Sequence, residues 1–475
     1  MRGGAGKTVV SVGLTAAWKR RLGLGIVAFK KGPDYIDAGW LSAASGNPCY
    51  NLDPFLMSAE QIVRSFVMRS SKGDGSLIEA NRGLYDGVDA NGSYSSAGLA
   101  KLLQCPVILV VDATKVTHTA AAMVLGCRMM DPGVNIAAVI LNQVAGKRHE
   151  QVLRESIESR CGVPVLGVVP RQRRDFFPER HLGLVPPEES EDIQGAIELA
   201  SARMSDYLDI EALWKLAAAS PGVDCPPPRV APDTNFTPRA VRIGIVRDSA
   251  FQFYYPENLE ALEERGANLV RISSLEDAPL PEIDALYIGG GFPETHLERL
   301  CANEVFRCSV KSAVEAGLPV YAECGGLMFL CHGIRHREKL HPMVGVFPFE
   351  IILGTKPQGH GYTVMECVGP NPFFRKGMIM RGHEFHYSGI AGAFDPTAFP
   401  FVFRLTKGHG IVAGWDGVCY KNVLACYSHL HAVGNEHWAD SMIAAALSYK
   451  RLKTTVSADY GLDRVRPQSH FPTLC

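Results

Sequence analysis

The sequence lacks the long apolar runs and the charge excess that mark several large classes of protein. No apolar run approaches the roughly 18 to 20 residues of a membrane span, and there is no leader of charged, apolar and small residues. The 48 Lys and Arg residues are balanced by 49 Asp and Glu residues, so no net field recruits nucleic acid or anionic lipid. We therefore expect neither nucleic acid nor a membrane as a partner.

Paired cysteines are also lacking. The 13 cysteines are scattered, without C-x-x-C pairs or zinc-finger spacing, which argues against a disulfide framework and favours buried thiols in a reducing cytoplasm. No internal repeat is evident. The apolar fraction of 47% and the charged fraction of 20% are those of ordinary globular domains, so substantial buried cores are expected.

Two α/β patterns are separated by a proline-rich segment. In residues 1–220, nearly uninterrupted apolar strands alternate with helix-compatible stretches, as in a parallel sheet covered on both faces. Residues 221–239 are dense in proline and have no apolar period, which predicts a linker. A second α/β pattern covers residues 240–453, and residues 454–475 form a predicted polar tail. We predict two doubly wound α/β domains.

A glycine-rich stretch at the start of the chain matches most of the phosphate-binding pattern G-x-x-x-x-G-K-[ST]. Its backbone N–H groups would cradle phosphate, its lysine would bind the outer oxygens and its threonine would hold magnesium. The residues concerned are Gly3, Gly4, Gly6, Lys7 and Thr8. The first glycine of the pattern falls where Met1 stands, so we hypothesise that the natural chain begins earlier, with one further buried strand.

Acidic side chains follow two apolar strands of the N-terminal half. Asp34 and Asp37 follow the strand that begins at Gly25, whereas Glu79 ends the next strand and Asp86 lies shortly after it. Open α/β sheets place ligands at the carboxyl ends of their strands, and carboxylates suit magnesium. Each acid alone is as well explained as a solvated loop charge. Their repeated position favours a metal site made by the loop threonine, Glu79 and Asp34, with Asp37 and Asp86 as further candidates.

Cys324 occupies a predicted turn between a short apolar strand and a helix. A thiol near the positive end of a helix favours the thiolate form. The glycines that follow it would let substrate and backbone N–H groups approach the sulfur, as an oxyanion hole requires. The alternative is a buried structural cysteine.

A predicted strand near the end of the chain, Val423–His431, brings His429 and His431 to its carboxyl end. With Cys324 they have the layout of a thiolate–imidazole pair, whose members are adjacent in the fold and not in the sequence. The alternative is a pair of hydrogen-bonded loop histidines. A strand-turn nucleophile and a strand-end base in one domain favour the catalytic interpretation.

These motifs resemble those of the cobyrinic and cobyric acid synthase family, in which a P-loop amidoligase is fused to a class I glutamine amidotransferase. The stretches that match the amidotransferase half are Glu323-Cys-Gly-Gly-Leu, Tyr287–Glu294 and Tyr427–His431. Those that match the other half are Lys31–Asp37, Glu79 with Gly83–Gly87, Asn142 and Arg180–Leu184. The resemblance implies a dethiobiotin synthetase-like P-loop domain followed by a flavodoxin-like amidotransferase domain.

The resemblance implies roles for individual residues. Cys324 would attack the glutamine amide and His429 would be its base, with Gly290, Gly291 and Gly325 near the glutamine or its oxyanion. Many class I amidotransferases have Glu two residues beyond the histidine, where this chain has His431, so the orienting residue stays open.

Further contacts are implied with nucleotide and substrate. Asn142 would join the glycine-rich loop in binding the nucleotide. The stretch Arg381–Ser388 resembles one that contacts a corrinoid in the branch of the family that amidates the a and c side chains. The residues implied to bind the substrate are Tyr35, Asp37, Asp86, His383, Glu384, His386 and Tyr387.

The function implied is a glutamine-hydrolysing amidation that depends on ATP and Mg²⁺. The a and c carboxylates of cobyrinic acid would be activated as acyl phosphates and amidated by internally transferred ammonia, in cobalamin biosynthesis in the cytoplasm. The same mechanism on nickel sirohydrochlorin or hydrogenobyrinic acid is one alternative. A regulatory or partitioning P-loop ATPase with a degenerate amidotransferase domain is another, against which the presence of both Cys324 and His429 argues. The sequence leaves the oligomeric state open, a homodimer being one candidate.

Overall fold

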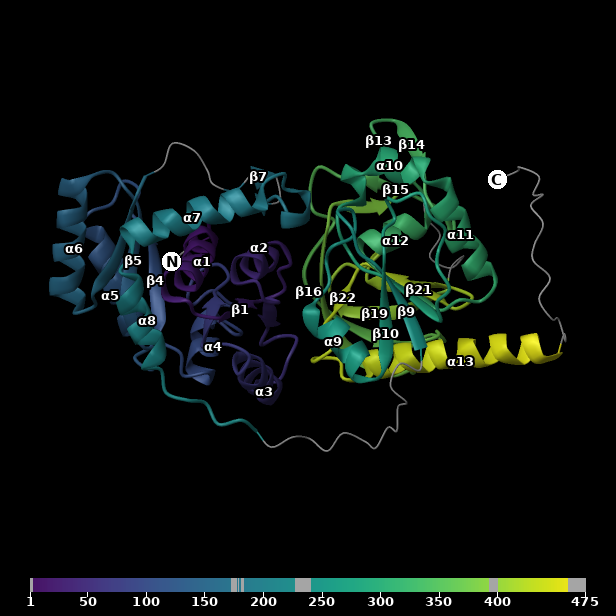
Figure 1. Ribbon diagram of the computed structural model, residues 1–475, viewed down its shortest axis with the longest axis horizontal. Coiled ribbons are helices and arrows are strands. Elements are labelled where there is room, and N and C mark those ends of the chain that lie inside the picture. The colour runs from purple at the N-terminus through teal and green to yellow at the C-terminus, as the bar shows by residue number, and fades with distance from the viewer. Residues whose placement is uncertain are drawn as a thin grey trace. The chain divides into compact units, whose positions relative to one another are not determined.

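The computed structural model describes residues 3–171, 177, 179–180, 183–226, 241–392 and 400–459. The chain divides into two compact units, Met1–Val230 and Ala231–Cys475, and Figure 1 shows the elements of each. The division falls within the segment predicted as a linker, whose residues 227–239 lie outside the described part. Within the described residues, no helix combines the length and the hydropathy needed to cross a membrane.

The N-terminal unit alternates helices and short strands, which are parallel except for one antiparallel pair near residue 180. Its helices are α1 (Lys7–Leu22), α2 (Ile36–Ser45), α3 (Ala59–Ser70), α4 (Ser96–Leu102), α5 (Thr119–Met130), α6 (Lys147–Cys161), α7 (Ile193–Tyr207) and α8 (Ile210–Ala218), with a 3₁₀ turn at Pro187–Glu189. Its strands are β1 (Ile26–Lys31), β2 (Tyr50–Leu52), β3 (Gly75–Glu79), β4 (Val107–Asp112), β5 (Ile136–Val144), β6 (Val165–Pro170), β7 (Glu179–Arg180) and β8 (Gly183–Leu184).

Two parallel sheets carry this unit, in the orders β2-β1-β3 and β4-β5-β6. A single continuous sheet would need a strand to bridge the two, and none of the described residues provides one. The sheets share a core under α1, because Leu77 of β3 and Val110 of β4 belong to the same apolar cluster. The α/β class predicted for this half is confirmed, as two short sheets in the described part.

Helix α1 is set by glycines at both ends and by close packing along its length. Gly6 (φ 83°) precedes it and Gly23 (φ 69°) follows it, both in the left-handed region that non-glycine residues rarely adopt. Figure 1 shows α7 lying alongside α1. A Cβ on Gly13 would stand only 2.4 Å from Met204 Cγ, so the two helices are in intimate contact.

The C-terminal unit contains both an α/β core and antiparallel sheet. Its helices are α9 (Pro256–Glu264), α10 (Leu297–Ala302), α11 (Glu304–Glu315), α12 (Gly325–Leu330) and α13 (His437–Asp459), with a 3₁₀ turn at Pro293–Thr295. Its strands are β9 (Val241–Val246), β10 (Ala267–Ile272), β11 (Ala285–Ile288), β12 (Val320–Glu323), β13 (Cys331–His336), β14 (Lys339–Pro342), β15 (Phe347–Leu353), β16 (Gly359–Cys367), β17 (Ile379–His386), β18 (Ser388–Ile390), β19 (Phe401–Lys407), β20 (Trp415–Tyr420), β21 (Val423–Cys426) and β22 (His429–Leu430).

The main sheet has ten strands in the order β10-β9-β11-β12-β21-β20-β19-β16-β17-β22. The first five are parallel and follow the flavodoxin-like order 2-1-3-4-5, which confirms the fold predicted for this half. The other five extend the sheet by antiparallel pairing, which the sequence patterns did not predict. Strands β14, β13, β15 and β18 form a smaller sheet.

Alternation along the parallel strands separates two cores. Leu286 and Ile288 of β11 face a cluster that includes α11 and α12, whereas Ala285 and Tyr287 face one that includes α9 and α13. Figure 1 shows α9 and α13 on one side of these strands and α12 on the other. Helix α13 continues to Asp459, so the polar tail predicted to start at residue 454 begins instead as helix. Residues 460–475 lie outside the described part.

The predicted strand Val423–His431 is wrong in one respect: it is two strands. Strand β21 ends at Cys426, and β22 begins at His429 but pairs with β17 at the far edge of the ten-stranded sheet. A flat sheet would set these two strands about 24 Å apart, whereas so short a connection reaches only about 10 Å. The antiparallel half must therefore curl back, and this brings β17 and His429 towards the end of β12.

Candidate functional site

Cys324 sits on a strained turn between β12 and α12. Its backbone has φ 50° and ψ −101°, a conformation that non-glycine residues rarely adopt. The turn is held on both sides, because Cys324 N donates to Cys426 O at 2.7 Å and Met328 N donates to Cys324 O at 3.1 Å. The structure therefore has the strand, tight turn and helix predicted around this cysteine, with the side chain at the tip of the turn.

Glycines line the turn where side chains would collide. A Cβ on Gly325 would lie 3.0 Å from Gly291 N, and one on Gly290 would lie 2.6 Å from His429 Cε1 and 3.3 Å from its Nε2. His429 is thus packed against Gly290, while the residue after Cys324 is packed against Gly291. The two predicted catalytic residues flank the same glycine turn, which brings all five predicted residues of this half-site together.

His429 is buried and held by its neighbours. Its Nδ1 lies 3.5 Å from Glu323 Oε2, with the two side chains 3% and 1% exposed. Its ring stacks on that of His383 at a centroid distance of 4.9 Å. Glu323 was quoted in the sequence motif without a role, and it is the carboxylate that faces the imidazole. The available signal was its position, because an acid at the end of a buried apolar strand is costly unless it is paired.

His431 is turned towards a different carboxylate. Its Nε2 lies 3.6 Å from Glu257 Oε1, and both side chains are fully buried. Its ring packs on Tyr255 at 4.6 Å, and the Tyr255 hydroxyl lies 3.2 Å from His383 Nδ1. Burial, together with the neighbouring His429 and His431, holds the pKa of His383 well below its usual range, so His383 is neutral at physiological pH.

The expectation of a resting thiolate at Cys324 is wrong. Burial, reinforced by the charges of Glu294 and Glu323, raises the pKa of the Cys324 thiol far above its usual value. Helix α12 spans only Gly325–Leu330, and its electrostatic effect does not outweigh the loss of solvation. Cys324 is therefore protonated at rest and needs a base to become a nucleophile.

Alkylation of free Cys324 by iodoacetamide should consequently be slow at pH 7. Only the thiolate reacts, so the rate should rise about tenfold per pH unit from pH 7 to pH 9 without a plateau. Mass spectrometry of the peptide that contains Cys324 measures the rate, and the exposed Cys225 is a reference thiol in the same digest. A plateau below pH 8 would show that the thiolate forms spontaneously.

Three of the four predicted substrate contacts on the Arg381–Ser388 stretch lie inside the C-terminal unit. His383, Glu384 and His386 are at most 5% exposed. Glu384 accepts hydrogen bonds from the amides of His409 and Gly410 at 2.6 and 2.9 Å. Although burial would raise the pKa of Glu384, these bonds and that from His386 hold it below its usual value. These side chains are almost wholly buried and brace β17, and their contact with a substrate stays a prediction.

The face of β17 opposite Glu384 and His386 is accessible at Phe385, although His383 on the same face is buried. Phe385 is 42% exposed and its ring packs against His360 of β16 at 4.7 Å and Tyr387 at 5.9 Å. Tyr387 itself is half-buried. Of the predicted substrate contacts on this stretch, Tyr387 alone joins this aromatic surface, and Phe385 and His360 were missed because pleat alternation was not applied to the motif.

The glycine-rich loop of the N-terminal unit leads into α1 as predicted. Lys7 is the first helical residue and Thr8 Oγ1 donates to Glu79 Oε1 at 2.8 Å. Asn142 Nδ2 donates to Ala5 O at 3.0 Å and lies where a Cβ on Gly6 would stand. Asn142 is buried, so it supports the loop from behind.

Lys30 is the charged centre of this site. It is 1% exposed, and its Nζ lies 2.8 Å from Glu79 Oε1, 2.6 Å from Asp37 Oδ2 and 3.8 Å from Asp34 Oδ2. Burial would lower the pKa of Lys30, but Glu79, Asp34 and Asp37 hold it well above its usual value. The sequence motifs gave Lys30 no role, and its pairing with Glu79, which is 49 residues away, is not visible in any local pattern.

The predicted metal ligands meet around Lys30, but not as a preformed cage. Among the described residues, no group of three or more His, Cys, Asp or Glu side chains is arranged to hold a metal ion. Glu79 Oε2 is nevertheless buried and accepts no hydrogen bond from the described residues. This free oxygen beside Thr8 fits a hard cation that also has phosphate oxygens as ligands.

The remaining predicted contacts lie further out. Asp86 is exposed and its Oδ2 accepts from Gly83 N at 2.8 Å, which closes the loop after β3. Tyr35 precedes α2, and Asp37 N donates to Asp34 Oδ1 at 2.9 Å. The stretch Arg180–Leu184 is only partly within the described residues.

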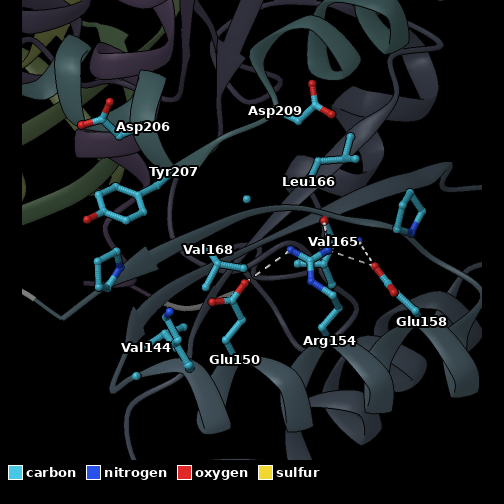
Figure 2. Close-up of a pocket in the computed structure, with 15 residues that line it drawn as sticks. Val144, Glu150, Arg154, Glu158, Val165, Leu166, Val168, Asp206, Tyr207 and Asp209 are labelled. Atoms are coloured by element: carbon cyan, nitrogen blue, oxygen red, sulfur yellow. Dashed lines mark hydrogen bonds and ion pairs between the residues drawn. The ribbon is translucent and has the colours of Figure 1, made fainter.

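A separate cavity of about 680 Å³ lies between α6, β6 and the junction of α7 with α8 (Figure 2). Arg154 crosses one wall and lies 3.8 Å from Glu150 and 3.2 Å from Glu158. None of the predicted site residues lines this cavity. Its lining carries four acidic and two basic side chains, and we assign it no role.

Comparison with known proteins accounts for both units. Residues 1–184 match the model of the CobQ/CobB/MinD/ParA nucleotide binding domain, and residues 242–437 match that of the CobB/CobQ-like glutamine amidotransferase domain. The cobyrinate a,c-diamide synthase of Magnetococcus marinus is 42% identical over 441 residues, which cover 92% of this chain and 94% of that protein. The protein of the same name from Caldanaerobacter subterraneus is 41% identical over 431 residues, which cover 90% and 93%.

The chain belongs to the cobyrinate a,c-diamide synthase family. Membership in this family agrees with the resemblance drawn from the motifs, since both matched domains occur in the expected order. The amidotransferase match contains Cys324 and His429, and the nucleotide-binding match contains the glycine-rich loop, Lys30 and Glu79. The two half-sites described above thus lie within the two matched domains.

Proposed function

We propose that this protein amidates the a and c carboxylates of cobyrinic acid, with ATP and glutamine as co-substrates, in cobalamin biosynthesis. The observation that carries the proposal is the near full-length match to relatives of that name, with both matched domains in one chain. The intact Cys324 and His429 argue against a regulatory ATPase with a degenerate amidotransferase domain. The reaction takes place in the cytoplasm and involves neither nucleic acid nor a membrane.

The N-terminal unit activates the carboxylate. The glycine-rich loop and Lys7 hold the phosphates of ATP, while Asn142 fixes the loop from behind. Mg²⁺, which neutralises phosphate charge, would be held by Thr8 and Glu79. Lys30 keeps Glu79 and Asp37 in place and offsets part of the negative charge that the acceptor carboxylate would meet. Asp34 and Asp86 would bind the metal or position the acceptor carboxylate.

The C-terminal unit releases ammonia. His429 removes the thiol proton of Cys324, and the sulfur attacks the glutamine amide carbon. The backbone N–H groups around Gly290, Gly291 and Gly325 would stabilise the oxyanion. Ammonia leaves towards the acyl phosphate, and water hydrolyses the thioester to release glutamate.

The corrinoid meets an aromatic surface on the β16–β17 hairpin. Phe385 is exposed and packs between His360 and Tyr387. An aromatic surface of this kind suits stacking against the flat face of a macrocycle. His383, Glu384 and His386 hold the hairpin in shape from within. Tyr35, Asp37 and Asp86 would contact the substrate from the N-terminal unit.

The purified protein, supplied with ATP, Mg²⁺ and glutamine, should convert cobyrinic acid into a product two amide groups richer. Parallel assays with hydrogenobyrinic acid and nickel sirohydrochlorin, each with mass detection of products, test the choice of macrocycle. A faster reaction with either alternative would move the assignment to that substrate. If none of the three macrocycles changed the rate of ATP hydrolysis, a regulatory ATPase would be favoured and the proposal would be contradicted.

A further inference from the structure

This chain has no carboxylate two residues after His429, where many class I amidotransferases have the third residue of the catalytic triad. The residue two places beyond His429 is His431, which cannot act as a carboxylate. It also faces away from the pair, since its contacts are with Glu257 at 3.6 Å and the ring of Tyr255. A base that is not oriented loses much of its effect, so another group must hold the imidazole of His429.

Glu323 is placed for this task by the pleat of β12. Tyr321 and Glu323 alternate with Ala322 and point to the same side of the sheet as Tyr287 of β11. Three donors hold the carboxylate: Tyr287 Oη to Oε2 at 3.0 Å, Tyr321 Oη to Oε1 at 3.1 Å, and Leu430 N to Oε1 at 3.0 Å. The last of these comes from the residue after His429, so Glu323 positions the backbone of β22 as well.

The two tyrosine hydroxyls that donate to Glu323 stay protonated. Burial, reinforced by the charge of Glu323, holds the pKa of Tyr287 well above its usual value. Burial, with Cys426 and Glu323, does the same for Tyr321. Both hydroxyls are therefore protonated and fix Glu323 as an acceptor, with Oε2 free to receive a further proton donor from the side of His429.

The two ring nitrogens of His429 face different partners. Nδ1 lies 3.5 Å from Glu323 Oε2. Nε2 faces Gly290, where a Cβ would stand 3.3 Å away, and this is the glycine turn that Cys324 shares. The ring of His383 stacks on that of His429 and is neutral, so it adds no charge beside these partners.

We propose that Glu323, the residue immediately before the nucleophile, is the positioning carboxylate of His429 and fills the third place of the triad. As the imidazolium forms, the Nδ1–H of His429 would donate across this 3.5 Å separation to Glu323 Oε2, with Nε2 directed at Cys324. The role rests on the proposed glutamine hydrolysis.

The proton balance follows from this arrangement. The Cys324 Sγ proton moves to His429 Nε2 while the sulfur forms a bond to the glutamine amide carbon. The resulting imidazolium is stabilised by Glu323, and its Nε2 proton passes to the departing ammonia as the carbon–nitrogen bond breaks. Water then loses a proton to Nε2 and attacks the thioester, which releases glutamate and restores the thiol.

Glu323→Gln tests the proposal in the full-length protein. We expect the kcat of glutamine hydrolysis to fall about 100-fold or more, KM for glutamine to change less than threefold, and the reaction driven by added ammonia to persist. Glu257→Gln is the matched control, because it removes an equally buried carboxylate from beside His431; it should cost less than about fivefold.

A spectroscopic readout separates positioning from general structural damage. In ¹⁵N–¹H spectra, His429 should carry its proton on Nδ1 in the wild type and shift towards Nε2 in Glu323→Gln, because an amide can donate to Nδ1. The resonance is assigned by its loss in His429→Gln. An unchanged tautomer, or glutamine hydrolysis within threefold of wild type, would overturn the proposal.

Glu323→Asp covers the case in which the glutamine variant does not fold. It keeps the charge but withdraws it by one methylene, so glutamine hydrolysis should fall about tenfold while the ammonia-driven reaction persists; full activity would contradict the proposal. If the wild-type protein hydrolysed glutamine but amidated no tetrapyrrole, the proposed function would fail and the role of Glu323 would still stand.

Discussion

Cys324→Ser should lower the glutamine-dependent reaction by at least about 10³-fold and leave the reaction driven by added ammonia within about twofold of wild type. The hydroxyl replaces a sulfur in a side chain that is 6% exposed, so the turn should keep its shape. What is lost is a nucleophile that His429 can deprotonate. Amide formation from glutamine and from ammonium chloride, measured by product mass on the same preparation, gives both rates.

Lys7→Ala is the complementary variant. Lys7 opens α1 directly after the glycine-rich loop, and without it the phosphates lose their cationic contact. Both the glutamine-driven and the ammonia-driven reactions should then fall together, while hydrolysis of glutamine alone continues. Equal loss of every activity in both variants would contradict a scheme with two separate half-sites.

Local patterns were sufficient for the parts of the fold that depend on neighbours in sequence. The glycine-rich loop before α1 and the strand–turn–helix around Cys324 are short stretches in which periodicity and glycine position specify the backbone. Of the five parallel strands of the C-terminal unit, the one before Cys324 and the one that starts at Val423 were predicted individually. These elements confirm the two α/β domains that the sequence predicted.

What local patterns missed depends on pairing between distant residues. The curl of the ten-stranded sheet separates β21 from β22, although the histidine motif looked like one strand. Glu323 meets Leu430 across 107 residues, and Lys30 meets Glu79 across 49. The Arg381–Ser388 motif was recognised as a string of residues, whereas alternation along β17 buries Glu384 and His386 and exposes Phe385. His383 is on the same face as Phe385 but is buried, and its ring stacks on that of His429. Such outcomes depend on tertiary contacts, which no single-segment pattern contains.

Lys30→Met should destabilise the N-terminal unit by about 3 to 5 kcal/mol, because it leaves buried acids without their shared cation. Glu79 is the most affected, since its side chain is 1% exposed, whereas Asp37 and Asp34 at 20% and 25% can turn partly to solvent. Methionine has a similar length and no charge, so the change isolates the electrostatic role. Hydrogen exchange of peptides from β1 and β3, measured by mass spectrometry, reports the loss, and peptides from the C-terminal unit should be unchanged.

Lys101→Met is the matched control for Lys30→Met, because it breaks an ion pair of the same length in a different setting. Lys101 Nζ lies 2.6 Å from Asp131 Oδ2, as Lys30 Nζ does from Asp37 Oδ2, but its side chain is 45% exposed. Water replaces the lost partner there, so the cost should be about 0 to 1 kcal/mol. If both variants lost the same stability, the acids around Lys30 would have to be protonated in the folded protein, and the site would hold a cation less tightly than the proposed phosphoryl transfer requires.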